Sequence, residues 1–224
     1  MRADLASGHP CIHSKGAPPA GARVSYRRIV RNLTRAGGSV VPAPGEAVVQ
    51  NGVLADANGA SMVANLPPGD YAICGAVLSL PYLDPCRWGT PPRVTISANA
   101  FTGYNLVLAR GVFLKVRIDD PKGLLPRTKD GPLRAANLIV GVDFRAGAFL
   151  GADNTGVDSA GRDYQMIVPA GEPLRLWLFS RDVVLTDSGG KPVDAPGALI
   201  PFQAAAGIDQ VFTFTVSGPA VPSK

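Results

Sequence analysis

Three side chains able to bind a metal ion stand within five residues near the start of the chain: His9, Cys11 and His13. Imidazole and thiolate are ligands that zinc and copper accept, and an extended backbone would place all three on one side. Pro10 and the lack of supporting polar groups favour instead an N-terminal tail of residues 1–13 without a metal. The sequence predicts no cofactor and leaves the role of these residues open.

The segment Thr186-Asp-Ser-Gly-Gly190 resembles the stretch that carries the nucleophile in chymotrypsin-like serine proteases. A catalytic serine of this kind needs a histidine base. The only two histidines lie in the N-terminal tail, so a Ser-Gly-Gly turn is the better interpretation. With no base, metal cluster or phosphate-binding loop, we predict that the chain is not an enzyme.

Cys74 and Cys86 stand twelve residues apart around a proline-rich loop. A disulfide that closes this loop is sterically reasonable, although the two thiols could also lie on separate strands. Tyr82 and Trp88 belong to the same stretch and are candidate ligand contacts, since rings on a rigid loop can stack on sugars or on a protein. The alternative is that Trp88 covers the core.

Five arginines stand within thirteen residues of this chain of net charge +5: Arg23, Arg27, Arg28, Arg31 and Arg35. The alternation in Arg23-Val-Ser-Tyr-Arg27 predicts a half-buried strand with its arginines in solvent. A patch that binds a polyanion is the alternative. No nucleic-acid motif or run of stacking aromatics accompanies the arginines, so nucleic acid is not an expected partner.

Composition and periodicity favour an all-β fold with little helix. The 224 residues include 26 glycines and 21 prolines, while 46% are hydrophobic. Apolar residues alternate in many short runs with turn residues between them, as in β-sandwiches. No hydrophobic run reaches the length of about 18 residues that spans a bilayer, and the first thirty residues lack the apolar centre of a signal peptide. Either the protein is cytoplasmic or its true start lies upstream of Met1.

One pattern occurs twice, 102 residues apart. An Asp-x-x-Gly turn leads into a strand that ends at a Gly-acid pair, and each copy predicts a hairpin. The residues of this turn signature are Asp56, Gly59 and Gly69 in the first copy and Asp158, Gly161 and Gly171 in the second. The repeat predicts two consecutive antiparallel sandwiches of about seven strands, residues 14–110 and 111–218, with a C-terminal tail of residues 219–224.

The first half resembles a known family. Ser14-Lys-Gly-Ala-Pro-Pro-Ala-Gly21, the Asp56 turn and Asn65-Leu-Pro-Pro-Gly-Asp-Tyr71 are similar to the carboxypeptidase regulatory-like domain, a prealbumin-like or carbohydrate-binding-like sandwich, over residues 14–108. The second half is a weaker relative, in which residues 124–137 look like an insertion. The resemblance implies a non-catalytic module, common on exported bacterial proteins.

The resemblance implies a strand before Ser14, where the sequence shows no clear alternation. Either the start is misplaced or another chain donates that strand. We therefore predict an extracytoplasmic binding or structural protein that acts through protein contacts, by self-assembly or with a partner. A carbohydrate-binding module that uses Tyr82 and Trp88 on a polysaccharide is the alternative. Related sandwiches can also carry a Lys–Asn isopeptide bond between strands. Lys115 lies on the predicted first strand of the second domain, but the last strand, Val211–Ser217, contains no Asn or Asp, so we do not expect this bond.

Overall fold

The structure, a computed structural model, describes ten stretches of the chain: residues 9–13, 21–31, 33–36, 39–42, 48–77, 79–98, 102–125, 138–144, 148–193 and 199–220. The chain divides into two compact units, Met1–Arg110 and Gly111–Lys224. Strands dominate both units, which confirms the predicted all-β class. No helix in the described stretches is long and apolar enough to cross a membrane.

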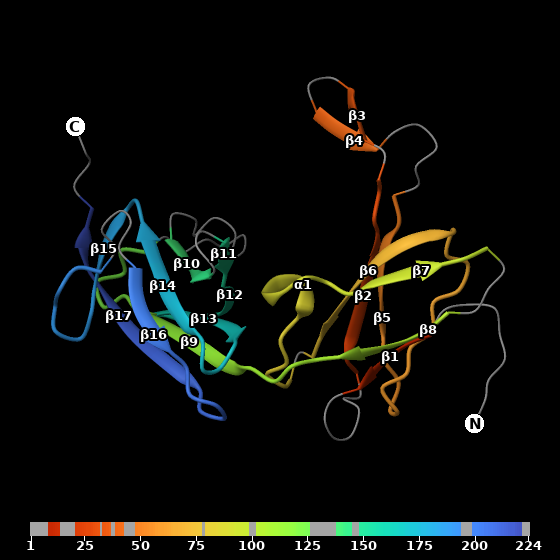
Figure 1. Cartoon of the computed structure of the whole chain (residues 1–224). Helices are drawn as coiled ribbons and strands as arrows, with labels where there is room; N and C mark the ends of the chain where they lie inside the picture. Colours follow the sequence, from red (N-terminus) through yellow and green to blue (C-terminus); the bar gives the residue numbers. More distant parts are fainter. Residues whose placement is uncertain are drawn as a thin grey trace. The chain divides into compact units, whose positions relative to one another are not determined.

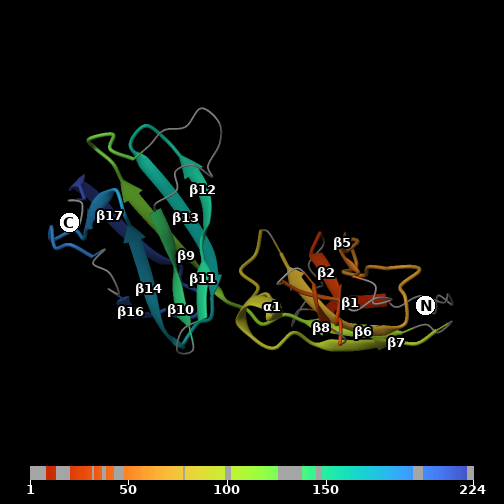
Figure 2. The same ribbon diagram turned by 90° about the horizontal axis from the view of Figure 1, so that it is seen from above.

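The first unit contains one four-stranded antiparallel sheet of order β5-β2-β6-β7, a parallel pair β1-β8 and a hairpin β3-β4. Figure 1 shows this hairpin projecting from the end of β2, and Figure 2 shows helix α1 at one end of the unit. The elements are β1 (His9–His13), β2 (Arg23–Arg28), β3 (Leu33–Ala36), β4 (Ser39–Pro42), β5 (Gln50–Leu54), β6 (Gly69–Ala76), α1 (Pro85–Trp88), β7 (Arg93–Ile96) and β8 (Gly103–Val107).

The predicted tail over residues 1–13 and the predicted gap before Ser14 are wrong for residues 9–13, which form β1. This strand pairs in parallel with β8, from His9 opposite Gly103 to His13 opposite Val107. A sheet ladder joins backbone groups, so a strand rich in His, Pro and Cys can pair without an apolar alternation to reveal it. The first-strand position of this unit is therefore occupied by the chain itself.

The second unit is built from two sheets, of orders β12-β13-β9-β17-β15 and β11-β10-β14-β16. All neighbours are antiparallel except β17, which runs parallel to β9. Its strands are β9 (Val112–Asp119), β10 (Leu138–Phe144), β11 (Ala148–Gly151), β12 (Asp153–Val157), β13 (Gly161–Val168), β14 (Pro173–Ser180), β15 (Val183–Thr186), β16 (Leu199–Gln203) and β17 (Gln210–Pro219). Most of the proposed insertion 124–137 lies outside the described residues.

The two units share a strand plan. The orders β5-β2-β6-β7 and β11-β10-β14-β16 correspond strand by strand along the chain, and in each unit the first strand pairs in parallel with the last. The predicted hairpin at the turn signature is present in the second unit as β12-β13. In the first unit no strand follows the turn, although Ser61 and Val63 are buried as alternate residues of a strand would be.

The first unit buries apolar residues of β2, β6, β7 and β8 in one core cluster. Gly75 of β6 explains how closely these strands approach, because a Cβ at this position would lie 2.7 Å from Leu106 Cδ2 and 3.1 Å from Leu108 Cδ2. The second unit repeats the arrangement with the fully buried Leu174, Leu176 and Leu178 of β14. The predicted alternation of core positions therefore holds in both units.

Candidate functional site

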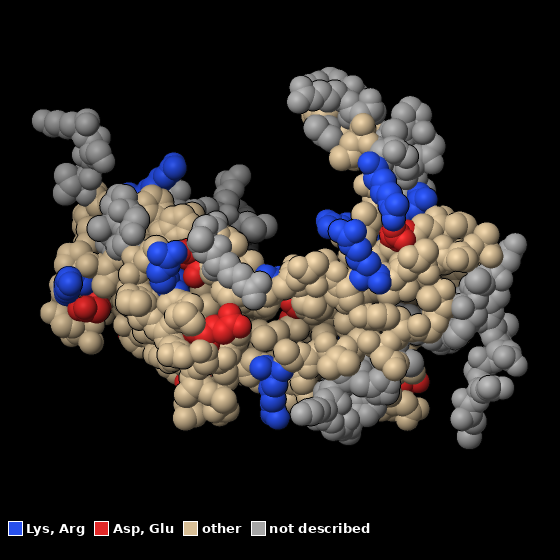
Figure 3. All heavy atoms as spheres, viewed as in Figure 1, with Lys and Arg blue, Asp and Glu red and all other residues tan. Residues whose placement is uncertain are grey.

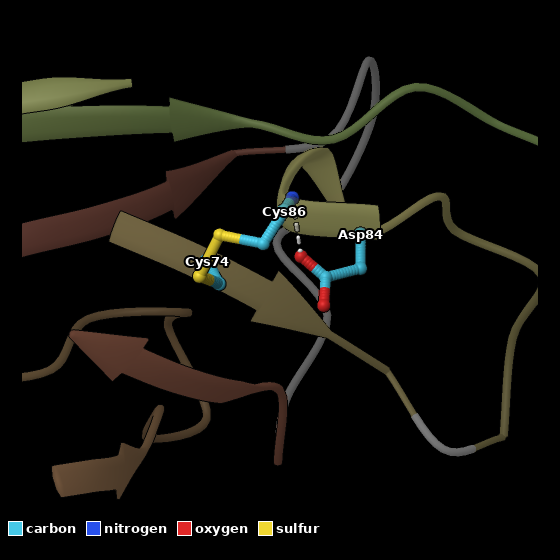
Figure 4. A group of neighbouring side chains, drawn as sticks. All are labelled: Cys74, Asp84 and Cys86. Atoms are coloured by element: carbon cyan, nitrogen blue, oxygen red, sulfur yellow. Dashed lines mark hydrogen bonds between the residues drawn. A yellow bond between two sulfur atoms is a disulfide. The ribbon is translucent and has the colours of Figure 1, made fainter. Parts of the chain in front are cut away.

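Cys74 and Cys86 form the disulfide that was one of the two expected arrangements, with their Cα atoms 5.4 Å apart. Figure 4 shows that Cys74 comes from β6 and Cys86 from the first turn of α1. Asp84 caps this helix, since its Oδ1 accepts a hydrogen bond of 2.9 Å from the Cys86 backbone N–H. Burial raises the pKa of the Asp84 carboxyl above its ordinary value.

The same three residues are the one group in the described part of the chain whose ligand atoms lie close enough together to hold a metal ion. Both sulfurs are consumed by the disulfide, so neither offers the thiolate that a metal requires. The cluster is a staple that holds the proline-rich loop against β6. The backbones of His9, Cys11 and His13 lie in β1, and the position of their side chains is outside the described structure.

The aromatic residues of this loop do not form an exposed platform. Trp88 is 8% exposed, and Tyr82 is half-buried against the core of the first unit. Tyr82 also forms an isolated backbone bridge with Arg110. Stacking on a sugar requires an open ring face, which Trp88 lacks. The structure therefore gives no support to the polysaccharide alternative based on Tyr82 and Trp88.

The turn signature has different physical causes in its two copies. Gly59 has a φ of +73°, and Asp56 Oδ1 accepts hydrogen bonds from the backbone N–H groups of Asn58 (2.8 Å) and Ala60 (2.9 Å). Gly161 has no positive φ, but a Cβ there would overlap the carbonyl oxygen of Ile118 on β9. The first glycine serves a left-handed turn and the second serves a close approach of two strands.

The turn that matches Asp56–Gly59 most closely is the protease-like segment. Asp187 Oδ1 accepts from the backbone N–H groups of Gly189 and Lys191, both at 2.9 Å, and Gly190 has a φ of +78°. Ser188 thus belongs to an aspartate-capped turn, as the Ser-Gly-Gly interpretation predicts. Gly69 and Gly171 at the second turns both have positive φ, of +151° and +78°.

An ion-pair network covers the outer side of β9, β12 and β13. Arg117 of β9 contacts the carboxylates of Asp119 (2.9 Å), Asp158 (2.9 Å) and Asp163 (3.0 Å). Hydrogen bonds from Arg117 and from the Ala160 backbone N–H hold the pKa of Asp158 down at about 2. The signature residue Asp158 therefore supports the sheet through a charge pair as well as a turn.

Sequence analysis missed an apolar surface on the second unit, on the outer side of β11-β10-β14-β16. Register places Trp177 of β14 level with Gly141 of β10 and Leu199 of β16, and Phe179 level with Ile139. These positions alternate with the buried residues of the same strands, so they lie on the side away from the core.

Phe149 of β11 completes this surface. Its ring meets Trp177 edge to face, with centroids 4.9 Å apart at 87°, and lies over Gly141, where no Cβ intervenes. Phe149 and Ile139 are 38% and 40% exposed, and the buried Trp177 Nε1 has no hydrogen-bond partner among the described residues. This surface, the aromatic face, consists of Ile139, Phe149, Trp177, Phe179 and Leu199. The signal was present in Leu174-Arg-Leu-Trp-Leu-Phe179, where Trp177 and Phe179 occupy outward positions that a solvated sheet would fill with polar residues.

A groove of about 650 Å³ adjoins the aromatic face at β16. Leu199, Ile200 and Pro201 of β16 form one side, and Val211 to Phe214 of β17 form another. The strand β16 is the last of its sheet, and the pairing of β15 with β17 begins only at Thr215. Within the described residues, one backbone edge of β16 and one of Gln210–Phe214 therefore have no strand partner.

No protein-family model matches the chain, and no curated protein matches it. Among solved structures, the Bacillus anthracis TIE protein is 9% identical with a TM-score of 0.33, and the match covers 94% of this chain and 34% of the TIE chain. GBS52, the minor pilin of Streptococcus agalactiae, is 12% identical with a TM-score of 0.40, covering 97% of this chain and 100% of its own. A streptococcal ancillary pilin is 14% identical with a TM-score of 0.38, covering 96% and 64%. This chain thus spans about a third of the TIE protein and less than two thirds of the ancillary pilin, and no functional argument rests on these likenesses.

Proposed function

We propose that this chain is a non-catalytic, extracytoplasmic binding protein whose second unit docks a protein partner on the aromatic face. The observation that carries the proposal is the pair Phe149 and Trp177 on the outer side of a sheet whose inner side already forms the core. A contiguous apolar surface that does not serve the core marks an interaction site. Aromatic residues on such surfaces supply much of the binding energy in protein complexes.

The groove beside β16 supports an extended partner segment. A strand added to the free edge of β16 would continue the sheet and would lie beside Leu199 and Pro201. In the first unit, β1 already fills the first-strand position beside β8. We therefore propose strand donation for the second unit. Backbone bonds to the edge would provide affinity, and the apolar lining would select alternate side chains.

The compartment and family form part of the proposal. A disulfide such as Cys74–Cys86 persists in an oxidising environment, which supports a periplasmic, secreted or surface location. The shared plan of the two units supports two consecutive prealbumin-like domains, of which residues 14–110 are the carboxypeptidase regulatory-like one and residues 111–218 the divergent one.

Selection of a random 16-residue peptide display library on the full chain tests the docking site. The test variant is Ile139→Asp, which places a charge on the aromatic face at a residue that is 40% exposed. Its matched control is Val157→Asp on β12, a residue of the other sheet that is 54% exposed. We expect selected peptides to bind Ile139→Asp at least about tenfold more weakly and Val157→Asp as tightly as the native chain.

Hydrogen exchange on the same complexes distinguishes strand addition from side-chain docking alone. We expect bound peptide to slow amide exchange in Leu199–Gln203 or Gln210–Phe214, because new ladder bonds protect amides. Peptides that bind all three proteins equally, or a selection that yields no binder, would refute the aromatic face as a protein-binding site.

A further inference from the structure

The whole net charge of the protein belongs to the first unit. Residues 1–110 contain ten Lys and Arg against five Asp and Glu, whereas residues 111–224 contain twelve of each. The formal charge of +5 is therefore +5 on one unit and zero on the other. Such an asymmetry concentrates the attraction for anions on one part of the chain.

Three arginines of this unit share the outer side of the sheet β5-β2-β6-β7. Register places Arg27 of β2 and Arg93 of β7 on either side of Ala72 of β6, so their Cα atoms stand about 10 Å apart across the sheet. Arg23 lies four residues along β2 from Arg27, about 13 Å away. All three arginines are exposed, and Figure 3 shows Lys and Arg side chains gathered over β2.

Asp70, which lies on the same side of the sheet as these arginines, is already engaged. Asp70 accepts a hydrogen bond of 2.7 Å from Thr95 Oγ1 and pairs with Arg31. These two contacts lower the pKa of Asp70, with a smaller contribution from the charge of Arg93. Within the described residues, no carboxylate forms an ion pair with Arg23 or Arg27. The outer side of this sheet therefore keeps a net positive charge.

The residues beside the arginines on β2 and β5 are small, namely Ser25 and Gly52. On β6 the same side carries Cys74, level with Ser25, whose disulfide joins it to Cys86 of α1. None of these three residues has a ring on which a nucleic-acid base could stack. The part of this surface over β2 and β5 leaves room for an extended chain whose charged groups recur along its length.

We infer that the first unit binds an acidic polysaccharide, carboxylated or sulfated, across Arg23, Arg27 and Arg93. The guanidinium groups bind the carboxylate or sulfate oxygens through paired N–H donors, and the small residues Ser25 and Gly52 allow the sugar chain to lie close to β2 and β5. This inference is independent of the protein-binding site on the second unit.

Isothermal titration of the full chain tests the inference with four probes: polygalacturonate, heparin, neutral dextran and duplex DNA of similar length. The variant Arg27→Gln with Arg93→Gln removes two charges from the sheet, and Arg23→Gln gives a single-charge step. The control Arg181→Gln with Lys191→Gln removes two exposed charges from the second unit. Unchanged thermal unfolding of each variant shows that it is folded.

We expect one or both acidic polysaccharides to bind and dextran not to bind. Affinity should fall at least about tenfold in Arg27→Gln with Arg93→Gln, and the slope of log K against log salt should decrease by about two, as for release of counterions from a polyanion. The control pair should change neither quantity. An equal loss in the control pair, tighter binding of DNA, or no binding of either acidic polysaccharide would overturn the inference.

Discussion

The four-stranded sheets of the two units have corresponding strand orders, but their outer surfaces differ in chemical character. The sheet of the first unit presents Arg23, Arg27 and Arg93, whereas the sheet of the second presents Phe149 and Trp177. Their inner surfaces are alike, because alternating apolar residues must fill a core in both. The inner alternation thus defines a shared fold, and the outer positions are free to carry different functions.

The units also differ in what reinforces them. The first has the Cys74–Cys86 disulfide, which ties β6 to α1. In the second, Arg117 forms ion pairs with three carboxylates, and Gly161 allows β13 to pack closely against β9. The two copies of the sequence repeat are therefore stabilised by different interactions. Four predictions, ordered by expected effect, test this difference.

The largest effect is expected at the first glycine of the turn signature. Gly161→Ala would force β13 away from β9, because its Cβ would overlap the Ile118 carbonyl, and we expect it to cost about 3 kcal/mol of unfolding free energy. Gly59→Ala should cost about 1 to 2 kcal/mol, the strain of a left-handed residue with a side chain. Urea unfolding measures both. Equal losses would mean that the two glycines have one role after all.

Loss of the disulfide should destabilise the first unit alone. Closing a loop of this length contributes about 2 to 3 kcal/mol, so Cys74→Ala with Cys86→Ala should lower the unfolding free energy of this unit by that amount. Hydrogen exchange reports each unit separately. The native chain should show the same loss in reductant, whereas the double variant should not respond to reductant. A response of β9 to β17 as large as that of β2 to β7 would contradict the separate reinforcement.

Sequence patterns could predict the parts of this structure that depend on side-chain alternation. The inward positions of β6, β9 and β14 follow directly from residues such as Ile73, Leu114 and Leu176. The strand β1 could not be predicted, because His9 to His13 carry no alternation and join β8 through backbone bonds alone. The pattern predicts a turn glycine at Gly161, whereas the structure shows a glycine that allows close packing against β9. The sequence alone does not distinguish these two roles of glycine.

The aromatic face could be predicted only in part from the sequence. Trp177 and Phe179 stand in a run whose alternate leucines are buried, so their outward position follows from the same alternation. Only the three-dimensional register brings Phe149, from another strand, onto Trp177. Binding surfaces of a sheet combine residues of several strands, and the pairing between strands is not readable from one sequence.

The Arg117 network should make the second unit sensitive to acid. The pKa of Asp158 is lowered to about 2 in the folded chain, mainly by its hydrogen bonds to Arg117. A lowered pKa stabilises the folded state above the ordinary carboxyl pKa, and this stabilisation is lost as pH falls from about 4 to about 2. Asp158→Asn should remove this part of the pH dependence of unfolding, and Glu172→Gln, an exposed acid of the same unit, should retain it. An unchanged acid profile in Asp158→Asn would exclude the network as the acid-sensitive element.

The smallest effect is expected where the first and last strands of the second unit meet. Asp209 precedes the stretch Val211–Ser217 and lies 2.6 Å from Lys115 Nζ, with the side chains 40% and 47% exposed. An exposed ion pair is screened by water and salt, so Lys115→Gln should change the unfolding free energy by less than about 0.5 kcal/mol. An isopeptide bond between Lys115 and Asp209 would form with loss of one water molecule. We expect no such bond, so the chain expressed from this sequence should have its calculated mass apart from the hydrogens lost in the disulfide. A mass lower by one water, absent in Lys115→Gln, would show a covalent link between these strands.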